Sequence, residues 1–400
     1  MFFKHFFKKP LNKKRIYLDY ASSTLLDRKM LSSFPKLESW YQGANPSALH
    51  KEGVALKKAL KHSRSLAGLA IGAQADEIIF TSGATESDNL AILGFLKNQI
   101  QSGVDPKEIA FYVSPFEHSA VEESLKNVYE GVRVCKLIQE GGYVLPNSID
   151  IREEVKVVLI SVIFVQNEIG SVQNIKEIAK RIRKLRKEYP DKQIVFHTDA
   201  TQAPLYYDLN VLRLGVDMMT LGATKLYCHK GVGMLFKKRS IKISPIIYGG
   251  GQELGLRPGT EPVSLISEFA HALSYAQAQY ERVHDHTLAL QNYFENKIKK
   301  ELPQIRITGI GQRAPHITHL VVPNIDSELL VLELDARGIA VSSKSTCRNE
   351  DADDSGIMKL LYPNQKLGAV RISYGRMTTK RELDKTIKAI SDVLEKYNLG

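Results

Sequence analysis

One lysine, Lys225, stands where a lysine side chain can bond covalently to a carbonyl compound. It ends the small-residue stretch Gly222-Ala-Thr-Lys225, between the β-rich runs 216–221 and 231–236. Small neighbours let a flat ligand approach the backbone closely. A partly desolvated lysine also loses its proton more easily and can form a Schiff base. On this stretch alone, the simpler interpretation is a surface lysine in a hairpin.

A second stretch, Thr81-Ser-Gly-Ala-Thr85, joins a β-rich run to a helix. Free backbone N–H groups at a helix N-terminus, helped by the hydroxyls of Thr85 and Ser87, bind a phosphate group well. An ordinary turn of small residues is the alternative. The chain has neither a GxxxxGK[ST] nor a GxGxxG motif, so the sequence does not indicate that this phosphate belongs to a nucleotide.

Further polar residues follow other β-rich runs. Asp199, in His197-Thr-Asp-Ala-Thr-Gln202, could pair with a protonated ring nitrogen, as a pyridoxal phosphate enzyme requires, or it could cap a helix. His118 could stack on a ring or relay protons, although a lone histidine is more often structural. Asn167 and Glu168 again follow a very apolar run.

The elements that must position these residues alternate between strand and helix. The runs with β character are 77–81, 109–113, 132–137, 155–164, 193–197, 216–221 and 231–236, and helices fit 51–69, 86–102, 119–130 and 175–188. This alternation predicts an α/β fold with a largely parallel sheet covered by helices on both faces. The candidate residues all follow strands, and ligands bind at the carboxyl ends of such strands.

Outside this sheet, a helix is expected at 27–41 and a long helix at 264–302. Short β runs near 305–307, 316–322, 340–342 and 369–373, with helices at 327–337 and from 379, predict a smaller α+β domain. The predicted division is a large domain of residues 16–275, and a small domain of residues 1–15 and 276–400.

Composition indicates a soluble protein. Of 400 residues 43% are hydrophobic and 25% charged, without an apolar stretch long enough for a membrane span. The net charge of +11 is dispersed over the helices without a nucleic-acid motif, which favours a solvated basic surface. Three widely spaced cysteines suggest a reducing compartment, so we expect a cytoplasmic protein. Residues 1–10 are basic and aromatic; we expect a frayed arm, with a presequence or a membrane-surface contact as alternatives.

Several segments together resemble the cysteine desulfurases, class V pyridoxal phosphate enzymes of fold type I, and within them the NifS/IscS-like group. The similarity runs in order from about Tyr17 to Arg376. Its segments are Tyr17-Leu-Asp-Tyr-Ala, Asn45-Pro-Ser-Ala-Leu-His, Phe80-Thr-Ser-Gly-Ala-Thr-Glu-Ser-Asp-Asn, Glu117-His-Ser-Ala-Val, Gln166-Asn-Glu-Ile-Gly, His197-Thr-Asp-Ala-Thr-Gln, Gly249-Gly-Gly-Gln-Glu and Arg257-Pro-Gly-Thr. The resemblance implies a seven-stranded, mostly parallel sheet in the large domain.

The resemblance also implies how pyridoxal 5'-phosphate would be held. Lys225 would bind it as a Schiff base, Asp199 would stabilise the ring nitrogen, and His118 would stack on the ring and relay protons. The other implied cofactor contacts are Gln202 at the ring hydroxyl, Ala84, Thr85 and Thr224 near the phosphate, Asn167, and Thr260 at the phosphate of a partner subunit. Where the family usually has a serine and a histidine before the lysine, this chain has Gly222 and Thr224.

For the substrate, the resemblance implies that Arg371 clamps a carboxylate, with Asn45 and Asn167 close by. The nucleophile would be Cys347, in the polar segment Val341-Ser-Ser-Lys-Ser-Thr-Cys347. A thiolate there is favoured by Lys344 and Arg348 and opposed by the acidic residues that follow.

The resemblance therefore implies a homodimer that converts L-cysteine to L-alanine and leaves a persulfide on Cys347. The sulfur would pass to an iron–sulfur scaffold or a tRNA-thiolation carrier, with no direct nucleic-acid or membrane contact. The alternatives are a related lyase or aminotransferase that does not need Cys347, and a degenerate, non-catalytic partner-binding homologue. No metal site is expected, because His316 and His319 would face opposite ways on one strand.

Overall fold

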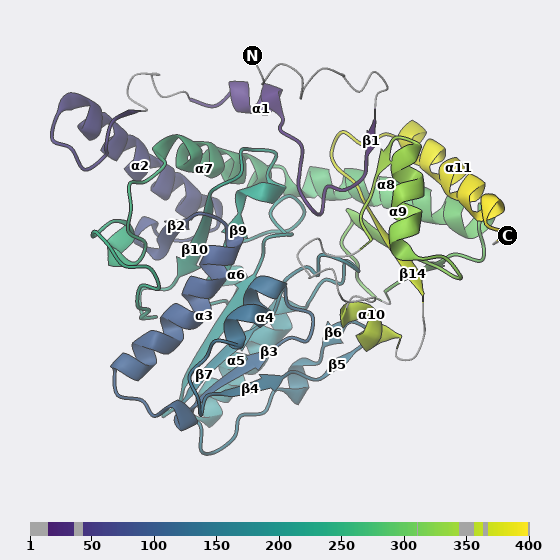
Figure 1. The fold of residues 1–400 in the computed structure, drawn as a ribbon. Helices are drawn as coiled ribbons and strands as arrows, with labels where there is room; N and C mark the ends of the chain where they lie inside the picture. The colour runs from purple at the N-terminus through teal and green to yellow at the C-terminus, as the bar shows by residue number, and fades with distance from the viewer. Residues whose placement is uncertain (1–14, 36–42, 310, 344–355, 363–366, 399–400) are drawn as a thin grey trace, which may run out of the picture.

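A seven-stranded sheet forms the centre of the molecule (Figure 1). The computed structural model describes all residues except 1–14, 36–42, 310, 344–355, 363–366 and 399–400. In spatial order, the strands are β2 (Ile78–Thr81), β10 (Gly233–Lys237), β9 (Met218–Gly222), β8 (Gln193–Asp199), β7 (Val157–Ser161), β3 (Ile109–Val113) and β4 (Arg133–Lys136).

The sheet is parallel except at β10, which runs antiparallel to both of its neighbours. The carboxyl ends of the other strands therefore meet at one edge. The predicted fold class, α/β with a mostly parallel seven-stranded sheet, is confirmed. Most of these strands are buried along their whole length, as expected for a sheet that is covered on both faces.

Alternation along each strand divides the core between the two faces of the sheet. Ile79, on β2, packs in one cluster with α3 (Ala84–Gln101) and α4 (Ser119–Leu125). Its neighbour Phe80 packs on the other face, with α2 (Lys51–Ala70), α5 (Ile175–Glu188) and α7 (Val263–Gln277). This two-residue period is what a pleated strand imposes.

A second core lies among the C-terminal elements. The antiparallel strands β11 (Arg306–Ile307), β12 (Ile317–Val322) and β14 (Gly368–Ser373) pack with α8 (Tyr280–Glu301), α9 (Ser327–Ala336) and α11 (Lys380–Lys396). β1 (Ile16–Tyr17) joins this region by parallel pairing with β13 (Ile339–Ala340). The predicted domain boundaries remain a prediction.

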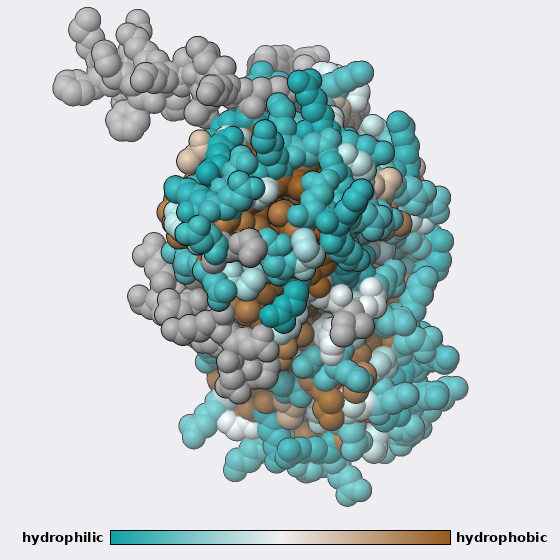
Figure 2. Space-filling model, turned by 90° about the vertical axis from the view of Figure 1, so that its right-hand side faces the viewer, coloured by the Kyte–Doolittle hydropathy of each residue, from teal (hydrophilic) through white to brown (hydrophobic). Residues whose placement is uncertain are grey.

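The face that carries these C-terminal elements is largely hydrophilic, with smaller apolar areas between polar side chains (Figure 2). On α11, Leu383, Ile387 and Ile390 are buried and the charged residues face outward. Among the described residues, no helix combines the length and the apolar character needed to cross a membrane. The remaining helices and strands are α1 (Arg28–Ser32), β5 (Gln139–Glu140), β6 (Tyr143–Val144), α6 (Val211–Leu214) and α10 (Gly356–Leu361), with 3₁₀ turns at Ala75–Glu77, Pro106–Glu108, Pro146–Ser148, Ala223–Lys225 and Glu253–Gly255.

Three predicted helices were wrong in their bounds, and one of them, the helix expected at 119–130, is α4 and ends at Leu125. The single helix expected at 264–302 is two helices, which end and begin around Ala278 and Gln279. Next to the break, Gln277 accepts from Leu209 N and donates to the carbonyl oxygens of Pro204 and Tyr207. The helix expected at 27–41 ends at Ser32, and Pro35 disfavours a helical conformation just before it.

Close backbone packing positions the loop 82–84 at the carboxyl edge of the sheet. A side chain on Gly233 of β10 would place its Cβ 2.6 Å from the Gly83 carbonyl carbon and 2.8 Å from Leu221 O. Glycine is therefore required here because two backbone segments touch, and the loop rests directly on the sheet.

We predict that Gly233→Ala lowers the free energy of unfolding by about 1–3 kcal/mol, because the backbone neighbours must shift. Thermal or denaturant unfolding measures the change. Gly43→Ala is the control, since no atom of the described residues lies within 4 Å of a Cβ there. Equal stability of both variants would mean that the loop accommodates a methyl group without cost.

Candidate active site

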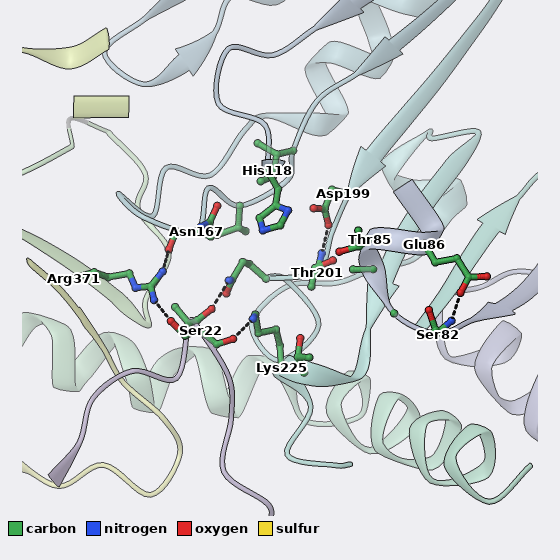
Figure 3. A pocket seen from close by; sticks show the side chains of 17 residues that line it. Ser22, Ser82, Thr85, Glu86, His118, Asn167, Asp199, Thr201, Lys225 and Arg371 are labelled. Carbon is green, nitrogen blue, oxygen red and sulfur yellow. Dashed lines mark hydrogen bonds between the residues drawn. The ribbon is translucent and has the colours of Figure 1, made fainter. Parts of the chain in front are cut away.

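A cavity of about 360 Å³ opens at the carboxyl edge of the sheet (Figure 3). The segments that follow β2, β3, β7, β8 and β9 contribute to its wall, as does β14. The lining residues are Ala21, Ser22, Ser82, Gly83, Ala84, Thr85, Glu86, His118, Ile163, Val165, Asn167, Asp199, Thr201, Gln202, Thr224, Lys225 and Arg371.

Lys225 lies at the end of the 3₁₀ turn that follows β9. Its side chain reaches into the cavity, and Nζ donates a hydrogen bond to the carbonyl oxygen of Ser22 (Figure 3). Lys225 does lie in the hairpin connection between the antiparallel strands β9 and β10, but the interpretation as a surface lysine is wrong. We expected the small residue Gly222 to let a flat ligand approach the backbone. In the structure, a Cβ on Gly222 would lie 3.2 Å from Ala84 Cβ, so a glycine at this position makes room for the loop 82–84.

The N-terminus of α3 forms one wall of the cavity. Its N-cap is Gly83, which offers no side chain to the free N–H groups, and Ala84 and Thr85 line the cavity. Such a terminus can receive an anion. Ser87, however, is buried and shares its hydroxyl with Thr81 Oγ1 (2.8 Å), so the expected help from Ser87 is wrong.

Asp199 ends β8 with a side chain that is only 5% exposed. Its Oδ1 accepts from Thr201 N (2.8 Å) in a turn, and the residues that follow are not helical, so the helix-cap alternative is wrong. Gln202, three residues later, donates from Nε2 to the carbonyl oxygen of Ala21 (2.7 Å). The Gln202 Oε1 atom lies 3.3 Å from Nε2 of the buried His316.

His118 caps α4 and points into the cavity beside Asp199 (Figure 3). Its Nδ1 accepts from Ala120 N (3.1 Å), which fixes the ring and identifies Nδ1 as an unprotonated acceptor in that contact. A neutral ring then carries its proton on Nε2. An imidazole held in this way can take part in proton transfer.

Buried acids lie behind Asp199. Asp88 on α3 is fully buried, and neither of its carboxyl oxygens has a hydrogen-bond partner among the described residues. Burial, and then the charge of Asp199, raise the pKa of Asp88 well above its usual value, and the pKa of the buried Glu117 is raised for the same reasons. Burial lowers the pKa of the neighbouring His197 to about 3, so this ring is neutral. Burial therefore favours the protonated forms of Asp88 and Glu117.

Arg371 comes from β14, on the other side of the cavity, and is 3% exposed. Its Nη1 donates to the carbonyl oxygen of Asn167 (2.6 Å), and its Nη2 donates to Asp19 Oδ1 (2.8 Å) and to Ser22 Oγ. A guanidinium so fixed suits recognition of a planar carboxylate.

Some predicted site residues are not brought to the cavity. Asn45 and Thr260 are exposed and do not line it, and Asn45 Oδ1 accepts from Ser47 N (2.8 Å). Cys347, with Lys344 and Arg348, lies outside the described residues. His316 stacks on Tyr206, whereas His319 pairs with Thr308. Within the described part of the chain, no group of three or more His, Cys, Asp or Glu side chains could hold a metal ion.

Sequence reasoning missed other residues that line the cavity: Ser22, Ser82, Glu86 and Thr201. Each of these residues lies within or next to a segment that the sequence analysis had identified, and this proximity could have indicated a place in the site. Glu86 Oε2 accepts from Ser82 N (2.8 Å) and its Oε1 accepts from Arg257 Nε (3.0 Å), so this carboxylate braces the loop before α3.

These groups fit pyridoxal phosphate. An amine, a buried carboxylate and an imidazole share the cavity with a helix N-terminus that lacks a side-chain cap. The buried hydroxyl of Thr201 also has no partner among the described residues, as expected of a group that awaits a ligand.

Comparison with known proteins agrees with this geometry. A family model described as aminotransferase class-V matches residues 16–386. A relative from Dictyoglomus turgidum, named cysteine desulfurase IscS, is 32% identical over 390 residues, which are 96% of this chain and 95% of the relative. The solved structure of a NifS-like protein matches with a TM-score of 0.83 at 25% identity, over 96% of this chain and 100% of that one. SspA in complex with cysteine matches with a TM-score of 0.74 at 27% identity, over 92% and 100% of the two chains.

We predict that Asp88→Asn stabilises the protein increasingly as the pH rises from about 4 to about 8. Because the folded-state pKa of Asp88 is raised above its usual 3.8, the folded protein keeps a proton that the unfolded chain has released, and stability falls as the pH rises through this window. Asparagine carries no such penalty. Denaturant unfolding of both proteins across this pH range measures the difference.

The control is Asp76→Asn. The exposed Asp76 has a pKa lowered by its hydrogen bond to Arg239, so its loss should reduce stability above that pKa, with the opposite sign. If the difference in free energy of unfolding between Asp88→Asn and the parent did not change with pH, the raised pKa of Asp88 would be contradicted.

Proposed function

This chain belongs to the class V aminotransferase family and, within it, to the cysteine desulfurases, and from that premise we propose that it takes sulfur from L-cysteine, releasing L-alanine and leaving a persulfide on Cys347. The enzyme is pyridoxal phosphate-dependent, as is its family. The observation that carries the proposal is the meeting of Lys225, Asp199, His118 and Arg371 in one cavity.

The proposed cofactor contacts follow from where each group lies. Lys225 would bind the cofactor covalently, and Asp199 would face its ring nitrogen, supported by its burial and its bond from Thr201 N. Ala84, Thr85 and Thr224 would receive the phosphate at the uncapped start of α3. When bound, pyridoxal phosphate withdraws electrons from the substrate, so that the proton on Cα becomes removable.

His118 and Gln202 would act on the ring and on protons. His118, held through Nδ1, presents its protonated Nε2 to the cavity, where it can donate a proton and take it back. Gln202 is oriented by Ala21 and His316 and would contact the ring hydroxyl.

The substrate carboxylate would bind to Arg371, with Asn167 beside it. We keep Asn45 as a proposed carboxylate contact, although it does not line the cavity in this chain alone. A fixed carboxylate would restrict the positions that the thiol of cysteine can take in the cavity. Orientation of this kind is what allows a second group to attack one particular atom.

That second group would be the thiolate of Cys347. The thiolate attacks the substrate sulfur, the new S–S bond forms as the bond from sulfur to Cβ breaks, and Cβ is then protonated to give alanine. The described cysteines suit this step less well. Burial raises the pKa of the Cys228 thiol to about 12, and Cys135 lies on the edge strand β4.

We further propose a homodimer in which Thr260 reaches the partner's phosphate, supported by the exposure of Thr260. The persulfide sulfur would go to an iron–sulfur scaffold or a tRNA-thiolation carrier. The proposed compartment is the cytoplasm, since a reducing environment keeps the nucleophilic thiol and the free Cys135 and Cys228 reduced.

We predict that the purified protein is yellow and that borohydride reduction traps the cofactor on Lys225. The reason is that Lys225 Nζ is the amine that lines the cavity. Peptide mapping by mass spectrometry identifies the labelled lysine, and Lys225→Ala should lose the covalent link. A label on the nearby Lys230 would place the chemistry elsewhere.

We predict that Cys347→Ala keeps the yellow colour and still binds cysteine, but makes almost no alanine and carries no persulfide. The cofactor alone does not supply a sulfur acceptor, so the step must stop there. Alanine release and intact-protein mass measure the two effects.

Cys135→Ala is the matched control and should behave like the parent, since Cys135 does not line the cavity. Full alanine production by Cys347→Ala would contradict the desulfurase mechanism and support the related lyase. No cofactor binding by the parent would support the non-catalytic homologue.

A further inference from the structure

Arg371 already has an anionic partner before any substrate arrives. Asp19 Oδ1 accepts from Arg371 Nη2 at 2.8 Å, and both side chains are largely buried, with 19% of Asp19 and 3% of Arg371 exposed. We propose that Asp19 is a positioning residue that acts as the resting counter-ion of Arg371, and that the carboxylate of an amino acid must displace it from Nη2. This inference rests on the proposed function, in which Arg371 binds the substrate carboxylate.

The backbone holds Asp19 firmly in this place. Asp19 forms a parallel bridge with Ser373, and Ala21 N donates to Ser373 Oγ at 3.0 Å. The Tyr17 hydroxyl donates to the carbonyl oxygen of Ser23 at 2.7 Å and closes the turn around Asp19. The contact with Arg371 is therefore built by the fold, and is not a chance meeting of two surface side chains.

The N–H donors of the Arg371 guanidinium do not all have acceptors. Nη1 donates to Asn167 O, and Nη2 donates to both Asp19 and Ser22. Nε is buried and has no partner among the described residues. A buried N–H without an acceptor is costly, so Nε–H is a donor that a ligand can satisfy.

The shape of the guanidinium then decides how a carboxylate can bind. Its two bidentate edges pair Nη2 either with Nε or with Nη1, so each edge includes Nη2. A carboxylate that takes the unpaired Nε–H must share or take over Nη2 as well. Asp19 keeps a donor when it withdraws, because Ser22 Oγ also donates to Asp19 Oδ1 at 2.8 Å.

This exchange has a consequence for affinity. Asp19 neutralises Arg371 in the resting site and repels a second carboxylate, and like charges at short range in a protein weaken binding strongly. Removing the charge of Asp19 while keeping a hydrogen-bond acceptor should therefore strengthen the binding of amino acids. A residue that merely held Arg371 in place would not have this effect.

The test compares Asp19→Asn with the parent, both as holoenzymes. Each is titrated with L-alanine, and with ethylamine, which lacks the carboxylate, while the absorbance of the bound cofactor is followed. We expect the ratio of the Kd of L-alanine to that of ethylamine to fall about tenfold in Asp19→Asn, as expected for removal of one nearby like charge. An unchanged or higher ratio would overturn the proposal.

Two further variants make the result specific. Asp19→Ala removes the charge and the hydrogen-bond acceptor together. If Asp19 only held Arg371 in place and was never displaced, Asp19→Asn would keep the parent's ratio of the two Kd values. Asp19→Ala would then bind L-alanine more weakly than the parent. Should Asp19→Asn not fold, Ser22→Ala removes the hydroxyl that donates to Asp19 Oδ1, so Asp19 should stay on Arg371 more tightly and the ratio should rise; an unchanged or lower ratio would count against displacement. A parent that binds L-alanine but makes none from L-cysteine would contradict the proposed function, while the ratio would still decide the role of Asp19.

Discussion

The backbone of residues 16–24 holds the two sides of the site together. On one side, Leu18 N donates to Ala340 O and Leu18 O accepts from Ser373 N, which joins the segment to the C-terminal strands. On the other side, Thr24 N donates to Thr224 O, just before Lys225. Backbone hydrogen bonds of this kind are obligatory once the groups are buried. The lysine and Arg371 therefore face one cavity because a short stretch of chain is bonded to the supports of both.

Several carboxyl groups are buried behind the cavity without a cation beside them, and this burial determines which of them is ionised. A buried ionised carboxylate is expensive, and neighbouring acids make it more so. Asp88 and Glu117 respond by keeping protons, as the direction of their pKa shifts indicates. Asp199 is then the acid among these three that lines the cavity, where a cationic ring nitrogen can compensate its charge.

The sequence predicted the parts of the site that depend on local order along the chain. Lys225, Asp199 and His118 each follow a β-rich run, and the parallel sheet brings such positions to one edge. Arg371 was reached only through the family resemblance, because its strand belongs to a different sheet. Its contact with Asp19 joins residues 352 positions apart, and no local pattern predicts such a pair. The break near Ala278 was equally hidden, since no glycine or proline marks it in the sequence.

The described site explains binding and proton transfer, but it offers no side chain suited to receive sulfur. Cys228 is buried with a raised pKa, and Cys135 stands on the far edge strand. In the proposed function the sulfur acceptor comes from another segment, and the chain limits how far away that residue can be. Arg371 N donates to Ser342 O at 2.7 Å, so the segment that leads to Cys347 starts beside the arginine that would hold the substrate. Five residues of fully extended chain span at most roughly 18 Å, so a nucleophile at position 347 is near enough along the chain to serve a substrate held by Arg371.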